Sequence, residues 1–568
     1  MAACYRYLGQ EHRFRAIAYE QAAQMLDALP VDISGYADSI AHLDSLKGIG
    51  ESIARKIMEY LDTGKIKTFD ALQKQVPYGL LELMDVRGMG PATIRTLHDE
   101  LGITSKDALM LAIENGKLAT VRGFGPQKIA LIRRALKLAH PDAKRHLLSD
   151  ALQVSNQLKD AIDRLPGAMQ VSVAGSVRRR KDTIGDIDLV ILARPAARAA
   201  LVKKIQRLPG VRKVLAAGQT RVSLLMESAS MQVDIRLVSS HEYGAAMLYF
   251  TGSKSHNIHL RIMAQERGWK INEYGLFDAG NGKRLAGATE ESIYQKLSLA
   301  YVPPELREDQ GEIELARSGK LPHLVEQHDI RGDLHIHSSW SDGHDSMDAI
   351  VSHYRTHFPQ YQYIVITDHS AGARLAHGLD EKRFREQFQA IDAINKKLGA
   401  DYLKKGVEVE LTADGSPELP DNILVQFDWV TASIHQGLTR DNTDRLIQAC
   451  RHPLVHGIGH PTGRLIGHRD PYPADWEKVF HEAAKTHTAL EINAQPQRMD
   501  LNDQMVRRAI QFKVKFMVGT DAHYLGQADL MSLGVAIARR GWCTAKQVLN
   551  TGSWDRVKKY SKARSRRT

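Results

Sequence analysis

Cysteine is scarce in this chain, which has three in 568 residues: Cys4, Cys450 and Cys543. The odd number and wide spacing exclude a disulfide framework and a zinc-finger arrangement and favour a reducing cytoplasm. Long apolar runs are also lacking, and none approaches the roughly 20 residues that cross a bilayer. The first 21 residues hold no apolar segment of the kind found in secretory signals. We therefore expect a cytoplasmic protein with no membrane partner.

The length and charge of the chain indicate several domains and a polyanionic partner. At typical domain sizes, 568 residues make about three to five domains. The net charge is +11, and residues 101–300 hold 31 Lys and Arg against 17 Asp and Glu. This basic excess suits nucleic acid, although a well-solvated surface accounts for the charge equally well. The last 13 residues, "RVKKYSKARSRRT", include seven basic side chains and predict a disordered tail that contacts phosphate non-specifically.

Three similar phrases in the N-terminal third each place two glycines before a helical pattern. They are "LKGIGESIARKI" at Leu46, "VRGMGPATIRTL" at Val86 and "VRGFGPQKIALI" at Val121. Paired glycines fit a tight turn whose backbone N–H groups can approach a phosphate at the positive end of the next helix. Three units with matching flanks favour helix-hairpin-helix elements, which bind the DNA backbone and often hold Na⁺ or K⁺, over simple packing corners. The predicted DNA-binding glycines are Gly48, Gly50, Gly88, Gly90, Gly123 and Gly125.

A pair of carboxylates stands on a predicted strand in "GDIDLVI", at Asp186 and Asp188. Residues two apart on a strand face the same side, and two such carboxylates repel unless cations lie between them. They are therefore suited to hold two Mg²⁺ ions for an in-line phosphoryl displacement. Asp234, on the apolar strand "MQVDIRLV", supplies a third carboxylate. The groups placed to contact phosphate oxygens are Gly175, Ser176, Arg178 and Arg179.

In the C-terminal third, β-rich runs repeatedly end in His, Asp or Glu, and helical patterns lie between them. Fifteen of the 25 histidines follow residue 330. This alternation of predicted strands and helices is typical of a β/α barrel with functional residues at the carboxyl ends of its strands. A single strand-end histidine is usually a core residue, but nine ligand-type residues favour a metal site. They are His335, His337, Asp342, His369, Glu408, His435, His460, Asp521 and His523.

The segment "YFTGSKSHNIHLRIMAQERGWKINEYGLF", which begins at Tyr249, closely resembles the nucleotide-binding thumb of family X DNA polymerases. With the upstream motifs, the resemblance covers about residues 1–318. It implies a catalytic triad of Asp186, Asp188 and Asp234 that holds Mg²⁺ or Mn²⁺. It also implies a triphosphate site at Arg145, Ser176, Arg179 and Gly185, a sugar pocket at Tyr249, Phe250 and Gly252, and contacts with the nascent base pair from Asn257 and Arg261. Arg180 and Lys254 depart from the glycine and the acid of the animal members, which bears on nucleotide affinity and fidelity.

Repair members of family X carry a Schiff-base lysine that removes 5′-deoxyribose phosphate, and Lys56 in "GIGESIARKI" occupies that position. Arg15, Tyr19 and Lys65 match parts of the phosphate anchor of the family, whereas Ser52 replaces a lysine of it. The chemistry needs a lysine of lowered pKa beside a phosphate anchor. A helix-surface lysine without a catalytic role is an equal alternative.

The strand-end residues match in full the ligand set of the polymerase and histidinol phosphatase (PHP) domain, over about residues 330–568. The phrases "HPTGR" and "EINAQPQRMDL" resemble the versions fused to bacterial family X polymerases. The resemblance implies up to three clustered Mn²⁺ or Zn²⁺ ions that promote phosphodiester hydrolysis. The implied sets are His335, His337, Glu408 and Asp521 for the first ion, Glu408, His435 and His460 for the second, and Asp342, His369 and His523 for the third.

The expected fold is therefore multidomain: α-helical hairpin domains, an α/β nucleotidyltransferase and a distorted, TIM-like β/α barrel. The expected parts are a lyase-like hairpin domain at 1–80, a fingers-type hairpin subdomain at 81–145, a palm at 146–240, a thumb at 241–318, a linker at 319–330 and a PHP domain at 331–568. A polar connector with one proline, "SGKLPHLVEQHDI", marks the boundary before the last part.

The predicted function is template-directed filling of short gaps with dNTPs, on gapped or primer-template DNA in base excision repair. The C-terminal half is expected to remove nucleotides 3′→5′, to trim blocked 3′ ends or to cut at abasic sites. Two alternatives stay open. The PHP half could be a small-molecule phosphomonoesterase, or the chain could be a DNA-end-binding scaffold with vestigial sites. A monomer is expected.

Overall fold

The computed structural model describes the chain except residues 28–32, 34–36, 47, 64, 77–79, 81–82, 84–88, 122, 126–127, 130–131, 133–144, 374–375 and 566–568. The chain divides into two compact units, residues 1–145 and residues 146–568. Among the described residues, no helix is long and apolar enough to cross a membrane.

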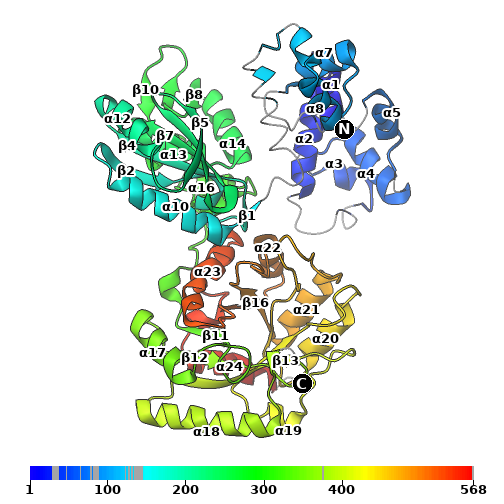
Figure 1. Cartoon of the computed structure of the whole chain (residues 1–568). Helices are drawn as coiled ribbons and strands as arrows, with labels where there is room; N and C mark the ends of the chain where they lie inside the picture. The colour runs from blue at the N-terminus through cyan, green and yellow to red at the C-terminus, as the bar shows by residue number, and fades with distance from the viewer. Residues whose placement is uncertain are drawn as a thin grey trace. The chain divides into compact units, whose positions relative to one another are not determined.

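The described part of the first unit is built from short helices (Figure 1). They are α1 (Ala2–Leu8), α2 (Arg13–Asp27), α3 (Ile40–Asp44), α4 (Glu51–Thr63), α5 (Lys67–Gln75), α7 (Pro91–Leu101) and α8 (Lys106–Glu114). Gly48 and Gly123 have φ values of 93° and 89°, which side-chain-bearing residues rarely adopt, so both turns need glycine. In each turn a backbone N–H bonds back three residues, Ile49 to Leu46 and Phe124 to Val121.

The second unit begins with a five-stranded sheet of order β2-β4-β7-β6-β5, in which only β4 and β7 run parallel. Its elements are β1 (His146–Leu147), α10 (Leu148–Asp163), β2 (Ala168–Val173), α11 (Gly175–Arg178), β3 (Thr183–Ile184), β4 (Asp186–Ala193), α12 (Pro195–Ile205), β5 (Val211–Ala217), β6 (Arg221–Met226) and β7 (Gln232–Val238). Leu189 and Ile191 of β4 pack into the core that α10 and α12 complete. Val190, on the opposite face, packs against Met247 of α13 (Tyr243–Thr251). Since side chains alternate along a strand, Asp186 and Asp188 lie on the α13 face.

A smaller subdomain follows, with a three-stranded antiparallel sheet of order β10-β9-β8. Its remaining elements are α14 (Lys254–Gln265), β8 (Trp269–Asn272), β9 (Gly275–Asp278), β10 (Arg284–Ala286), α15 (Glu290–Lys296) and α16 (Glu312–Ser318). Its core is formed by α13, α14, α15 and α16 together with the chain that links them. The connector after α16 is packed in place, because buried Val325 donates its N–H to Cys543.

The last part is a seven-stranded parallel sheet in sequence order, with helices packed around it (Figure 1). Its strands are β11 (Gly332–Ile336), β12 (Tyr363–Ile366), β13 (Leu403–Glu410), β14 (Trp429–Ser433), β15 (Gly457–Ile458), β16 (Ala489–Asn493) and β17 (Phe516–Gly519). Its helices are α17 (Met347–His357), α18 (Glu381–Leu398), α19 (Asp421–Leu424), α20 (Thr443–Arg451), α21 (Trp476–Thr486), α22 (Asp503–Gln511), α23 (Met531–Arg540) and α24 (Trp554–Ser565). The first and last strands meet, since His337 N–H donates to Ala522 and Asp521 N–H to His335, both at 2.8 Å. The predicted distorted β/α barrel is confirmed.

The prediction of a disordered C-terminal tail is wrong for most of its length, because α24 continues to Ser565. Trp554 and Val557 lie one helical turn apart and are buried against Leu334, Tyr363 and Trp429. Tyr363 and Trp429 are the first residues of their strands and Leu334 is central in β11, so α24 covers the amino-terminal end of the barrel. Exposed Arg556 and Lys559 lie on either side of buried Val557 in the sequence, so composition alone did not reveal the apolar contact.

Candidate functional site

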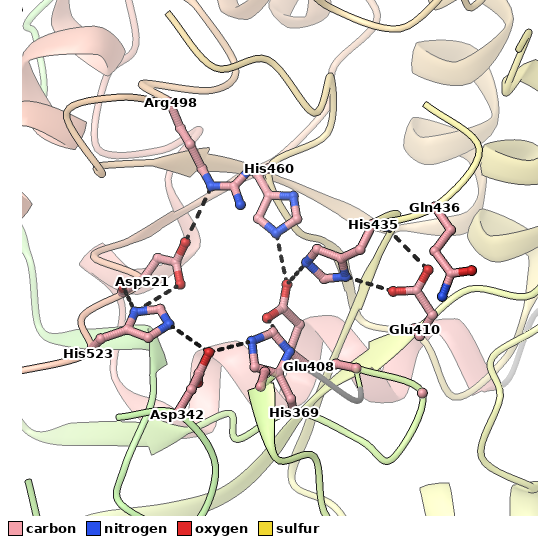
Figure 2. A pocket seen from close by; sticks show the side chains of 13 residues that line it. Asp342, His369, Glu408, Glu410, His435, Gln436, His460, Arg498, Asp521 and His523 are labelled. Carbon is pink, nitrogen blue, oxygen red and sulfur yellow. Dashed lines mark hydrogen bonds and ion pairs between the residues drawn. The ribbon is translucent and has the colours of Figure 1, made fainter. Parts of the chain in front are cut away.

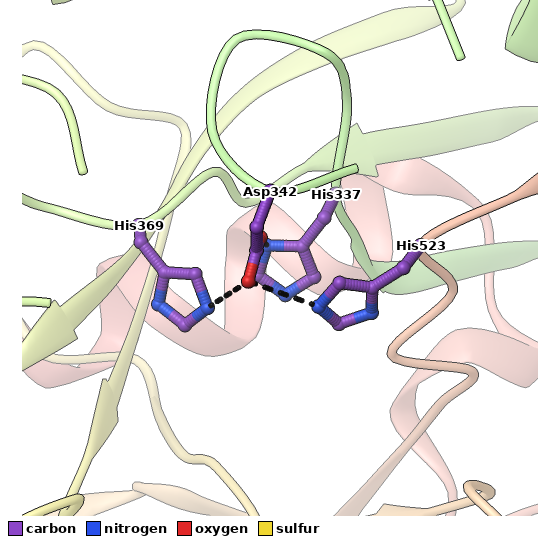
Figure 3. A group of neighbouring side chains, drawn as sticks. All are labelled: His337, Asp342, His369 and His523. Atoms are coloured by element: carbon purple, nitrogen blue, oxygen red, sulfur yellow. Dashed lines mark ion pairs between the residues drawn. The ribbon is translucent and has the colours of Figure 1, made fainter. Parts of the chain in front are cut away.

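The nine predicted PHP ligands converge at one end of the barrel. His335 lies in β11 and Glu408 in β13, and the others follow the carboxyl ends of their strands or lie in the loop after β11. Because all strands are parallel, these ends meet on one side. The structure brings the nine side chains into three groups, and within each group one ligand atom per residue lies within 4.8 Å of every other. The groups are His335, His337 and Asp521; Glu408, His435 and His460; and His337, Asp342, His369 and His523. Figure 3 shows the last group, in which His337 adds to the three residues that the sequence had placed together.

Glu408 stands between the groups. Its Oε2 lies 3.4 Å from Nε2 of His335 and 3.1 Å from Nδ1 of His369. Its Oε1 lies 2.9 Å from Nε2 of His460 and 3.6 Å from Nε2 of His435. Burial raises the pKa of Glu408, but the surrounding imidazoles outweigh it, and the pKa lies well below its ordinary value. The side chain is therefore an ionised carboxylate with one oxygen toward each side, as a bridging ligand requires.

Two further carboxylates orient His335 and His435 by contacting the ring nitrogen that points away from the ligand cluster. Glu491 accepts from Nδ1 of His335 at 2.6 Å, and Glu410 pairs with Nδ1 of His435 at 2.6 Å. Each contact turns the Nε2 atom of the ring toward the ligand cluster, as is usual for histidines that bind metal. The sequence analysis missed both residues. The signals were present, since Glu410 shares a strand and a face with Glu408, and Glu491 lies in the quoted "EIN".

The donor atoms fit divalent metal ions. His335 Nε2, both ring nitrogens of His337 and His369 Nδ1 are buried, and none makes a well-aligned hydrogen bond with a described group, although carboxylate oxygens of Glu408 and Asp521 lie 3.1 to 3.4 Å from three of them. Buried polar atoms normally have partners, so these nitrogens indicate missing ligands. Burial, followed by the neighbouring His523 and His369, lowers the pKa of His337 to about 4, which leaves the neutral imidazole that a metal needs.

A cavity of about 840 Å³ opens over this cluster and is lined by seven of the nine ligands (Figure 2). Arg498 is the one guanidinium among its described lining residues, and its Nε lies 3.8 Å from Asp521 Oδ2. A cation at the rim of an otherwise acidic and histidine-rich cavity is suited to hold a phosphate group. Arg498 belongs to the quoted "EINAQPQRMDL", but its place beside the cluster required the tertiary fold.

The three palm carboxylates also lie together. In the β4–β7 pairing Asp188 stands directly beside Asp234, and Asp186 is on the same face. A Cβ atom on Gly175 would lie 2.2 Å from Asp188 Oδ2, which explains the glycine of the Gly175-Ser176 pair. Burial, then the charges of Asp186 and Asp234, raises the pKa of Asp188 to about 8. This cluster therefore attracts cations strongly.

Strand β6 holds Asp234 in position, which the sequence analysis did not anticipate. Asp234 accepts hydrogen bonds from Ser223 Oγ, from Gln232 at 2.7 Å and from Arg221 at 3.2 Å. Burial raises the pKa of Asp234, but these donors outweigh it and hold the pKa below its ordinary value. Finding Ser223 and Arg221 requires the register of β6 against β7, which a single sequence does not reveal.

Most of the predicted nucleotide contacts lie on α11 and α13 or in the segments beside them. Ser176 lies in α11, Gly185 immediately precedes β4, and Tyr249 and Phe250 lie at the end of α13 before Gly252. Asn257 donates to the Tyr249 carbonyl at 2.8 Å, and the Arg261 guanidinium lies 5.4 Å from the Tyr249 ring.

Arg178 pairs with Glu290, whereas Arg179 pairs with Glu308. Arg145 is the last residue of the first unit. Arg180 has a φ of 58°, a conformation that favours the glycine of the animal members.

In the first unit, Arg15 and Tyr19 both contact the Tyr5 ring, at 5.8 Å and 5.5 Å between centres. Lys56 Nζ donates to the carbonyl and the hydroxyl of Ser52, at 2.8 Å and 2.9 Å. Of the predicted DNA-binding glycines, Gly50 and Gly90 directly precede α4 and α7. Gly88 lies outside the described residues.

Comparison with known proteins agrees with this geometry. Residues 1–66 match the "Helix-hairpin-helix domain", residues 80–138 the "SAM-like Helix-hairpin-helix tandem" and residues 246–308 the "DNA polymerase beta thumb". DNA polymerase lambda is 25% identical in Rattus norvegicus and 24% in Arabidopsis thaliana, over 53% of this chain and 54% and 59% of those proteins. "DNA polymerase/3'-5' exonuclease PolX" of Bacillus subtilis is 35% identical over 99% of this chain and 97% of its own length. The chain therefore belongs to the PolX family, the bacterial family X DNA polymerases with a C-terminal PHP domain.

Proposed function

We propose that the chain is a DNA polymerase that fills short gaps during repair and a metal-dependent 3′→5′ exonuclease. The observation that supports this most is the presence of two separate ligand sets, three carboxylates on β4 and β7 and nine ligands on the barrel. Two complete sets of different chemistry also argue against a scaffold with vestigial sites.

In the polymerase half, Asp186, Asp188 and Asp234 are proposed to hold Mg²⁺ or Mn²⁺. Hard carboxylate oxygens suit these ions, which would align the primer 3′-hydroxyl with the α-phosphate and neutralise developing charge. Arg221 and Ser223 fix the orientation of Asp234. The residues proposed to bind the dNTP are Arg145, Ser176, Arg179, Gly185, Tyr249, Phe250, Gly252 and Asn257, with Arg261 beside the nascent pair. The helical hairpins of the first unit are proposed to bind the DNA backbone, with Na⁺ or K⁺ at their carbonyls.

In the barrel, imidazole and carboxylate ligands suit Mn²⁺ or Zn²⁺, and these ions would activate water and stabilise the departing oxygen of a phosphodiester. Glu410 and Glu491 keep the ligand imidazoles oriented. Arg498 is proposed to hold the terminal phosphodiester over the cluster.

A gapped DNA with a 3′-end-labelled primer tests both halves together. With Mn²⁺ and dNTPs the primer should be extended by the length of the gap, and with Mn²⁺ alone its 3′ label should be released as a mononucleotide. If the primer is stable but a soluble phosphate ester is hydrolysed, the barrel is a small-molecule phosphomonoesterase. If neither reaction occurs, the DNA-end-binding scaffold is the better reading.

Replacing Arg498 with alanine is expected to slow exonuclease turnover about 10- to 100-fold, because the phosphodiester loses the guanidinium that the described lining residues supply. The release of labelled mononucleotide measures the effect, and metal content per chain should stay unchanged. Arg498→Lys, which keeps the charge but loses the planar fork, should recover part of the rate. An exonuclease rate for Arg498→Ala equal to that of the unchanged protein would remove Arg498 from the site.

Lys56 is proposed to form a Schiff base with an incised abasic site, at the position of the lyase lysine of repair members. Borohydride reduction of the mixture should then leave a covalent protein–DNA adduct on the unchanged protein and none on Lys56→Ala. An equal adduct on both would assign the chemistry to another amine, and no adduct on either would favour a surface lysine bonded to Ser52.

A further inference from the structure

A loop at the end of the polymerase half, residues 305–310, contacts both halves of the second unit. On the nucleotide side, Ser253 N–H donates to the Arg307 carbonyl at 3.0 Å, directly after the predicted sugar-pocket glycine. On the barrel side, Arg507 of α22 donates to the Gln310 carbonyl at 2.8 Å. The loop therefore lies where barrel side chains can act on the nucleotide site.

Arg540, the last residue of α23, also contacts this loop, and only 5% of its side chain is exposed. Its Nη1 donates to the Arg179 carbonyl at 2.7 Å and to Glu308 Oε1 at 3.1 Å. Its Nε donates to Asp503 at 2.8 Å. A buried guanidinium with two carboxylates and a carbonyl is held in one position.

Arg179 continues the line of contacts to the sugar pocket. Its Nε donates to the same Glu308 Oε1 at 3.0 Å, and its Nη1 donates to the Thr251 carbonyl. A Cβ atom on Gly252 would lie 3.1 Å from this Nη1, so the guanidinium lies against the pocket backbone. Asp503, Arg540, Glu308, Arg179 and Thr251 thus form one chain of polar contacts from the barrel to the nucleotide site.

We propose that Arg540 of the barrel is a positioning residue for nucleotide binding in the polymerase half. This inference rests on the proposed function, in which Arg179 contacts the triphosphate. Glu308 is one carboxylate shared by two guanidiniums. Arg540 neutralises part of the negative charge of Glu308 and fixes the main chain at Arg179. The Arg179 guanidinium can therefore still donate hydrogen bonds to phosphate oxygens. Without Arg540, Arg179 is the remaining guanidinium that pairs with Glu308. The Glu308 carboxylate then competes with the triphosphate for Arg179.

Arg540→Ala in the full chain is expected to raise KM for dNTP about 5- to 30-fold in single-nucleotide gap filling, with kcat within about threefold. The exonuclease rate should stay within about twofold, which also shows that the barrel is folded. Arg539→Ala is the matched control. It removes the adjacent contact with Glu305, at 2.8 Å, without touching Arg179, and should leave KM for dNTP near that of the unchanged protein.

Adding Glu308→Gln to Arg540→Ala tests whether the charge of Glu308 causes the rise in KM for dNTP. A merely structural role of Arg540 would give no recovery of KM in the double variant. If Glu308 captures Arg179 in Arg540→Ala, then adding Glu308→Gln should return KM for dNTP most of the way to the unchanged value. Should Arg540→Ala fail to fold, Asp503→Asn, which loosens Arg540, should raise KM for dNTP in the same direction and be corrected by the same second change. No rise in KM, an equal rise in Arg539→Ala, or no recovery with Glu308→Gln would overturn the inference.

Arg179→Ala separates this inference from the proposed function. It should raise KM for dNTP at least as much as Arg540→Ala does. If Arg179→Ala leaves KM unchanged, the nucleotide contact itself is wrong, and the inference falls with it. If Arg179→Ala raises KM and Arg540→Ala does not, the nucleotide contact stands and only the role of Arg540 fails.

Discussion

Asp188→Asn is expected to reduce DNA synthesis by about 10³-fold or more, while the 3′→5′ exonuclease stays within about twofold. Asp188 lies beside Asp234 at the centre of the palm carboxylates, and asparagine keeps its shape but loses the charge that holds the cations. Primer extension and primer shortening, measured on the same gapped DNA, check both parts. Synthesis that survives the change would remove Asp188 from the palm site, and a lost exonuclease would indicate a folding defect.

The same variant should be more stable than the unchanged protein without metal. Burial and two neighbouring carboxylates raise the pKa of Asp188 to about 8. Since the ordinary value is lower, the folded state holds a proton that the unfolded chain has released, and stability falls as pH rises from about 4 to about 8. Asparagine does not titrate, so in chelator at about pH 8 the variant should gain about 1–2 kcal/mol, and less at about pH 5. Thermal unfolding at the two pH values measures this, and a gain that is equal at both would contradict the raised pKa.

Glu408→Gln is expected to reduce the exonuclease by about 10³-fold or more and to leave gap filling within about twofold. Glu408 is the buried carboxylate whose two oxygens face the histidines of all three groups. Glutamine keeps the volume of the side chain but removes its charge. It also replaces one carboxylate oxygen with an NH₂ group, which donates hydrogen bonds where the neighbouring imidazoles need an acceptor. The metal content per chain, measured by elemental analysis, should fall by at least about one ion.

Glu410→Gln provides the matched control for Glu408→Gln, since it lies two residues along the same strand and contacts His435 from behind. It should cost only about 10- to 100-fold in exonuclease rate. Equal losses in the two variants would mean that Glu408 orients a ligand and is not itself one. An unaffected exonuclease in Glu408→Gln would place the nuclease site elsewhere.

The sequence was most informative where local chemistry and strand position coincide. The convergence of the nine barrel residues could be predicted because they end or follow β-rich runs, and parallel strands bring such ends together. Asp186 and Asp188 could be paired for the same reason, by alternation on one strand.

The supporting residues could not be predicted, because they act across the fold. Arg221 and Ser223 reach Asp234 only through the register of β6 and β7. Arg498 reaches the barrel cavity through a loop, and Arg540 contacts Arg179 across 361 residues of sequence. The wrong prediction of a disordered C-terminal tail arose from local composition. The basic composition concealed the apolar side chains Val557 and Tyr560, which pack with Trp554 against the barrel.

That last helix also limits how DNA can use the barrel. The ligands lie at the carboxyl ends of the strands, while Trp554 and Val557 of α24 close the opposite end against Tyr363 and Trp429. The interior of such a barrel is packed with side chains, so it offers no passage between the two ends. A DNA strand therefore reaches the ligand cluster from the carboxyl ends of the strands, so the terminus to be cut enters and leaves on the same side of the barrel.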